Sequence, residues 1–108
     1  MSTTKIRAWD VWLANVQFED SPETKPRPVI ITETGESFIL ALKVTSHEPR
    51  DMWGEYQLIE WRAAGLQRES TVRISKRLKL PETAMAHRIG TLHPVDVVAI
   101  RSIMTKRK

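Results

Sequence analysis

The chain has 108 residues, of which 41% are hydrophobic and 28% charged, so it is predicted to form one globular domain rather than a disordered or fibrous protein. It contains no cysteine, which excludes disulfides, thiolate metal sites and cysteine nucleophiles, and no apolar run of the roughly 20 residues that a membrane span needs. The formal net charge of +4 favours a polyanionic partner. We therefore expect a single cytoplasmic domain over residues 1–108, with its core at about 7–104.

Short apolar segments that alternate with polar residues predict a small antiparallel β-barrel. The first strand is expected at residues 10–18, with a single core face formed by Trp12, Ala14, Val16 and Phe18. Residues 19–26 are rich in proline, acidic and small polar residues, as in an exposed loop. Because Pro28 confines Arg27 to extended conformations, Arg27 is predicted to start a second strand that continues over residues 28–32.

The third strand is predicted at residues 37–44, where polar and apolar residues alternate. A polar loop follows at 45–54; its Trp53 is interpreted either as an exposed aromatic side chain or as part of the core. Residues 55–61 are predicted to form a further strand, and residues 62–66 a helical turn that ends at Gly65. A strand at 70–77 should bury Val72 and Ile74 and place four polar residues on its outer face: Thr71, Arg73, Ser75 and Arg77.

The stretch from Arg62 to Lys79 contains six basic residues and one acidic residue, Glu69, so it accounts for the whole net charge. This stretch is either a polyanion-binding surface or a solvated strand face. A last strand is expected at 88–92. The only predicted helix covers 94–104, with a proline near its start, Asp96 in its first turn and an apolar stripe that includes Val95, Val98 and Ile103.

The sequence contains neither a nucleotide-binding motif nor a metal-binding motif. The four glycines are isolated, so no loop can cradle a nucleotide phosphate. The histidines His47, His87 and His93 lack the spacing of metal ligands and are interpreted as surface or loop residues. We therefore expect neither a metal nor a cofactor.

Four stretches, taken together, carry a family signal: WDVWLANVQF (9–18), KPRPVII (25–31), LKVTS (42–46) and AGL followed by STVRI (64–66, 70–74). Their order resembles the MazF/PemK family of toxin ribonucleases, and the Arg-Pro-Val step after a proline-containing loop is the most telling part. The resemblance implies an SH3-like (CcdB/PemK-like) antiparallel barrel with a C-terminal helix, paired as a homodimer. It also implies a toxin that cleaves single-stranded RNA without a metal, leaving a 2′,3′-cyclic phosphate and a 5′-OH, and a cognate antitoxin protein that inhibits it.

The same resemblance implies the catalytic residues. Family members pair the arginine of the Arg-Pro step with a threonine or serine at the end of the next long strand, and some use a later Val-Arg arginine; the matching residues are Arg27, Thr45, Ser46 and Arg73. A positioned guanidinium can stabilise the phosphorane and the leaving oxygen without a metal. Cations, hydroxyls and an aromatic ring suit single-stranded RNA, so RNA contacts are predicted from Lys25, His47, Trp53, Ser70, Ser75 and Arg77.

Other interpretations remain open at this stage. Arg27 could instead form an ion pair with Glu19, Asp20 or Glu23, and Thr45 and Ser46 could serve only in a strand-end turn. Trp9 stands where the family often has a glycine, and Ser75 where some members have an aspartate, so the general base is not identified, although His47 could substitute. The alternative functions are a non-catalytic barrel that binds RNA or a protein, and a relative of the gyrase-poisoning toxins, which the basic tail 105–108 does not favour. An antitoxin segment is expected along Arg73 and Arg77.

Overall fold

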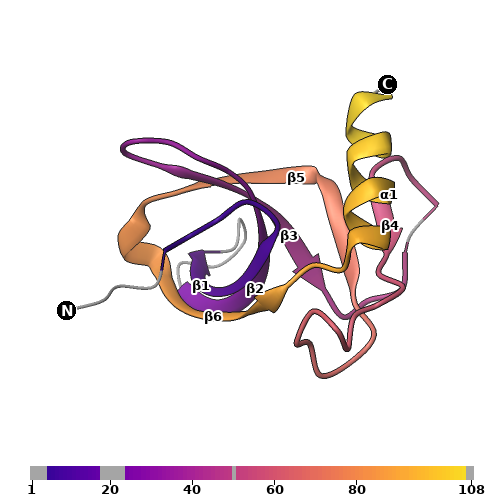
Figure 1. The fold of residues 1–108 in the computed structure, drawn as a ribbon, viewed down its shortest axis with the longest axis horizontal. Coiled ribbons are helices and arrows are strands. Elements are labelled where there is room, and N and C mark those ends of the chain that lie inside the picture. The colour runs from indigo at the N-terminus through magenta and orange to yellow at the C-terminus, as the bar shows by residue number, and fades with distance from the viewer. Residues whose placement is uncertain (1–4, 18–23, 50, 107–108) are drawn as a thin grey trace.

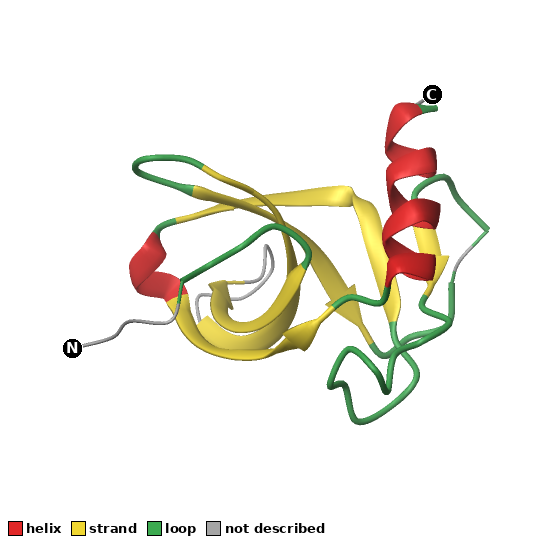
Figure 2. Ribbon diagram, in the orientation of Figure 1, coloured by secondary structure: helices red, strands yellow, loops and turns green. Residues whose placement is uncertain are grey.

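The structure, a computed structural model, describes residues 5–17, 24–49 and 51–106. Its strands form one antiparallel six-stranded sheet in the order β4-β5-β3-β2-β1-β6 (Figures 1 and 2). The elements are β1 (Asp10–Gln17), β2 (Thr24–Thr34), β3 (Ile39–Thr45), β4 (Glu55–Gln57), β5 (Thr71–Leu80), a 3₁₀ turn (Glu82–Ala84), β6 (Met85–Thr91) and α1 (Pro94–Thr105). The predicted mainly-β fold with a C-terminal helix is confirmed. The sheet curls but is not closed, since β4 and β6 are its two edges.

The curled sheet buries side chains on both of its faces. Adjacent residues of a strand enter different clusters: Val11 packs toward Ile100 of α1, whereas Trp12 packs in a second cluster with Val29 and Ala41. The prediction of one core face for the first strand is therefore incomplete. Strands buried on both sides explain why so many short apolar runs fit in so small a domain.

Strand β2 is longer than predicted, because Thr24, Lys25 and Pro26 belong to it rather than to a loop. Arg27 therefore lies inside the strand, opposite Ala14 of β1. Strand β3 stops pairing with β2 at Val29, so the preceding prolines lie where β2 has a strand neighbour on one side only. Proline, which cannot donate a backbone hydrogen bond, is tolerated in such edge-like positions. Phe18 and the carboxylates of residues 19–23 lie outside the described residues.

Strand β4 is shorter than predicted, and the strand expected over 55–61 is wrong beyond Gln57. The cause is the carboxylate of Asp96, which is fully buried. It accepts hydrogen bonds from the backbone N–H groups of Ile59 (3.0 Å) and Glu60 (2.9 Å) and from the Tyr56 hydroxyl (2.6 Å). These bonds turn the chain out of the sheet, and the predicted turn that ends at Gly65 follows.

Strand β5 contains a large bulge that changes the expected side-chain pattern. Leu42 pairs with Arg77, but the next residue, Lys43, pairs with Arg73, so residues 74–76 have no partner in β3. Figure 1 shows β5 bending sharply before it reaches β4. The prediction that Arg73 and Arg77 share one outer face is wrong, because the bulge separates them. Thr71, also expected outside, is buried with an exposure of 1%.

Helix α1 is confirmed, but its predicted apolar stripe is partly wrong. Val95 and Val98 are exposed, at 43% and 68%, whereas Asp96 and Ile100 are buried. Asp96 and Ile100 are four residues apart, so they lie on the same face of the helix. The His93 ring caps the helix by accepting a hydrogen bond from the Val95 N–H at 3.0 Å. Among the described residues, no helix is long and apolar enough to cross a membrane.

Candidate functional site

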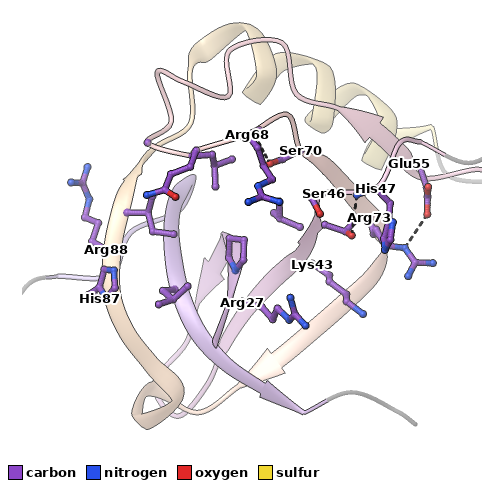
Figure 3. Close-up of a pocket in the computed structure, with 18 residues that line it drawn as sticks. Arg27, Lys43, Ser46, His47, Glu55, Arg68, Ser70, Arg73, His87 and Arg88 are labelled. Carbon is purple, nitrogen blue, oxygen red and sulfur yellow. Dashed lines mark hydrogen bonds and ion pairs between the residues drawn. The ribbon is translucent and has the colours of Figure 1, made fainter. Parts of the chain in front are cut away.

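A cleft of about 890 Å³ opens where β2 and β3 part (Figure 3). The last pair between these strands is Val29 with Lys43, and continuing their register by two residues would bring Arg27 level with Thr45. The strands separate at that point, and both residues line the cleft. The pair that the family resemblance implies is thus brought to one site by the end of a strand ladder.

The cleft is strongly cationic. Among the described residues that line it, the basic side chains come from five segments that are distant in the sequence, and the single carboxylate is that of Glu55. The five cations are Arg27 (β2), Lys43 (β3), Arg68 (in the segment after β4), Arg73 (β5) and Arg88 (β6). Low-dielectric walls concentrate the field of such a charge set, so the cleft attracts an anion with several charges.

Arg73 and Arg88 each form an ion pair with a carboxylate. The Nε of Arg73 donates to Oε2 of Glu55 at 2.9 Å, and the two side chains have exposures of 14% and 2%. The Nε of Arg88 donates to Oδ2 of Asp10 at 3.2 Å, with exposures of 43% and 7%. Thr91 joins this second pair, because its hydroxyl donates to Asp10 at 3.0 Å and accepts from a terminal nitrogen of Arg88. Both arginines are therefore oriented before any ligand binds.

Hydroxyl groups form another edge of the cleft. The Oγ1 of Thr45 accepts a hydrogen bond from the His47 N–H at 3.3 Å, so the strand-end turn considered from the sequence is present. This bond leaves the hydroxyl proton of Thr45 available to a phosphate oxygen. Thr71 donates to the carbonyl of His47 at 2.5 Å and ties this loop to β5. Ser46 is exposed beside them.

Another wall of the cleft is the segment 58–70, which carries Arg68 and Ser70. The Ser70 hydroxyl donates to the Arg68 carbonyl at 2.9 Å. Gly65 has a φ of +91°, and a Cβ at this position would lie 2.6 Å from the carbonyl oxygen of Ile89 in β6. A residue with a side chain would therefore push the wall away from β6.

The base of this wall is fastened to α1 by Asp96 and Tyr56. Burial, together with the hydrogen bond from its hydroxyl to the Asp96 carboxylate, raises the pKa of Tyr56 above its ordinary value. The neutral form of the Tyr56 hydroxyl is therefore the one that makes the hydrogen bond to Asp96 at the base of this wall.

All four predicted catalytic residues line the cleft, as do His47 and Ser70. The other four predicted RNA-binding residues lie outside it. Lys25 is exposed on β2, Ser75 lies in the β5 bulge, and Trp53 is half-buried against the core cluster that includes Ile100. Arg77 lines a separate groove beside α1. Their contacts with RNA stay predictions, and core packing, the other interpretation of Trp53, is what the structure shows.

Sequence reasoning did not assign a role to five further ionisable residues of the cleft. They are Lys43, Glu55, Arg68, His87 and Arg88. Arg68 could have been identified from the sequence, because it belongs to the basic stretch. No local sequence pattern predicts the pairing of β6 with β1, which brings Arg88 into the cleft. No group of histidine and acidic residues in the described part of the chain could hold a metal ion.

Comparison with known proteins adds one finding. No protein-family profile matches the chain, and no curated protein matches it significantly. Among solved structures, the chain is similar to the toxin MazF-mt6 of Mycobacterium tuberculosis, with a TM-score of 0.69 and 20% sequence identity. The match covers 88% of this chain and 91% of that one. The chain therefore has the MazF fold, and its cationic cleft lies within that fold.

Proposed function

We propose that this protein is the toxin of a type II toxin–antitoxin system and acts in the cytoplasm as a metal-independent endoribonuclease on single-stranded RNA. The observation that carries the proposal is the cleft itself. In a MazF fold, Arg27, Thr45, Ser46 and Arg73 line one cavity with three further cations. These are the side chains that the sequence resemblance implies for such a reaction.

The proposed reaction uses the RNA's own 2′-hydroxyl. Its oxygen forms a bond to the adjacent phosphorus while the bond to the 5′-oxygen breaks and that oxygen takes up a proton from water, which leaves a 2′,3′-cyclic phosphate and a 5′-OH. Negative charge grows on the phosphorane oxygens, where the Arg27 and Arg73 guanidinium groups stabilise it. Thr45 or Ser46 donates a hydrogen bond to the phosphate. His47, which lines the cleft, is the candidate to accept the 2′-OH proton.

Two partners belong to the proposal. A cognate antitoxin would insert an acidic and hydrophobic segment that competes with RNA for the cleft cations, Arg68 and Arg73 in particular. A second copy of the chain would form a homodimer, which the exposed apolar side chains Val95 and Val98 on α1 support.

The proposal is tested by incubating long single-stranded RNA with the purified protein in the presence of EDTA. The wild type should yield discrete fragments, Arg27→Ala should yield none, and Arg101→Ala should cut normally, because it removes the same charge from α1, away from the cleft. RNA that is bound but left intact by the wild type over a broad set of sequences would instead indicate the non-catalytic binding barrel.

A further inference from the structure

The cleft contains one acidic side chain whose role the proposed reaction does not explain. Glu55 has a side-chain exposure of 2% and lies among five cations. A carboxylate at this position weakens the attraction of the cleft for RNA, and its burial costs hydration energy. Attraction of RNA therefore does not explain why a carboxylate is buried at position 55.

The geometry shows what Glu55 holds. Glu55 and Arg73 are direct partners in the ladder between β4 and β5, and Glu55 accepts the bond from Arg73 Nε at 2.9 Å. The Nε bond fixes the direction of the guanidinium plane. The terminal nitrogens of Arg73 have no hydrogen-bond partner among the described residues. They form the planar fork that matches a phosphate.

The backbone on both sides of this pair is also fixed. The bulge of β5 begins directly after Arg73, and the Ile74 N–H donates to the Gly54 carbonyl at 2.5 Å. The next residue of β4, Tyr56, points to the other side of the strand and bonds to Asp96 of α1. Glu55 is therefore fastened to the helix through its own strand.

We propose that Glu55 is a positioning residue for RNA cleavage: it binds Arg73 Nε and so directs the terminal nitrogens of Arg73 to the scissile phosphate. This inference rests on the proposed function. Glu55 does not serve as the general base, because its side chain is almost fully buried and already accepts a hydrogen bond from a guanidinium, which leaves it poorly placed to reach a 2′-OH.

The test compares Glu55→Gln with Asp10→Asn, which makes the same carboxylate-to-amide change at the partner of Arg88, another arginine of the cleft. For each variant, kcat and KM on single-stranded RNA are measured separately, with the melting temperature as a check of folding. We expect Glu55→Gln to lower kcat by about 10- to 100-fold, the usual loss when a group that orients a reacting side chain is removed. Its KM should stay the same or fall, because the cleft loses a negative charge. Asp10→Asn should change kcat by no more than about threefold, because it alters the orientation of Arg88, to which the proposed reaction gives no part in stabilising the phosphorane.

A second pair of variants guards against a folding defect. Arg73→Lys keeps the charge but not the Nε bond, so it should lose kcat to a similar extent, and adding Glu55→Gln to it should cost little more. An unchanged kcat with a lower KM for Glu55→Gln would overturn the proposal, because Glu55 would then be a counter-charge only. Additive losses in the double variant would also overturn it. A wild type that cuts no RNA would remove the proposed function, whereas an active wild type with a fully active Glu55→Gln would remove this inference alone.

Discussion

Two arginine–carboxylate pairs of the cleft, Arg73 with Glu55 and Arg88 with Asp10, differ in how far their side chains are exposed to solvent. Arg73 and Glu55 face each other across two paired strands, with side-chain exposures of 14% and 2%. Arg88 and Asp10 belong to β6 and β1, with side-chain exposures of 43% and 7%. Both arginines donate Nε to a buried carboxylate, but the Arg88 side chain is far more exposed than that of Arg73. We expect the exposure of the arginine, rather than the presence of a carboxylate, to decide how much each ion pair contributes.

The largest expected difference between the two pairs is in the free energy of unfolding that is lost when each arginine is replaced by alanine. Arg73→Ala removes the guanidinium that donates to the buried Glu55 carboxylate, so it should destabilise the fold by about 3–5 kcal/mol. Arg88→Ala should cost no more than about 1 kcal/mol, because the guanidinium that it removes is more exposed and Asp10 keeps the hydrogen bond from the Thr91 hydroxyl. Urea unfolding of both variants measures the two values. Equal losses would show that the difference in burial has no energetic consequence.

The pair of Arg73 and Glu55 depends on the position of β4, and Asp96 of α1 holds β4 by hydrogen bonds. Asp96→Ala removes the acceptor of three hydrogen bonds that hold β4 and the segment after it, so we expect a loss of about 3 kcal/mol, since hydrogen bonds to a charged group are the stronger ones. The same unfolding measurement on Ser102→Ala, an exposed change on the same helix, gives the control. A loss below about 1 kcal/mol for Asp96→Ala would contradict this account of why β4 ends at Gln57.

A cation with no carboxylate partner should behave differently from both pairs. Among the described residues, the Arg68 side chain has no ion-pair partner and lines the cleft. Arg68→Ala should therefore weaken RNA binding and lower the slope of log Kd against log salt by about 0.7, the value for one phosphate contact to a single strand. Fluorescence anisotropy with an RNA that carries 2′-O-methyl groups measures binding without cleavage. A slope equal to that of the wild type would place Arg68 outside the RNA path.

The smallest expected effect is confined to alkaline pH. The pKa of Tyr56 is raised in the folded protein, so the stability from its neutral hydroxyl is complete below about pH 10, the ordinary tyrosine pKa, and is lost as the pH rises above it. Tyr56 is the only tyrosine of the chain, so tyrosinate absorbance reports it alone. Its titration should lie well above that of the unfolded chain, and Tyr56→Phe should lack the alkaline loss of stability. Titration at the ordinary pKa in the folded protein would refute the bond to Asp96.

The sequence predicted what depends on local pattern. The helix from Pro94, the strand of alternating residues (predicted at 37–44, observed at 39–45) and the burial of Val72 and Ile74 follow from spacing, and the resemblance placed Arg27 and Thr45 in one site. Long-range contacts decided the rest. The bulge that separates Arg73 from Arg77 depends on pairing with β3, and the early end of β4 depends on Asp96, which lies about 40 residues further along the chain. Glu55 has no local signal, because its role follows only from lying opposite Arg73.

The central claim is that the cleft directs attack by the RNA's own 2′-OH, and the most direct measurement analyses the ends of the fragments. RNA is cut by the wild type in EDTA, the cleavage position is mapped, and the same RNA is prepared with one 2′-deoxy nucleotide at that position. The account predicts 2′,3′-cyclic phosphate and 5′-OH ends on the first RNA and no cleavage of the second at that position. Fragments with a 5′-phosphate, or normal cleavage of the deoxy-substituted RNA, would contradict it.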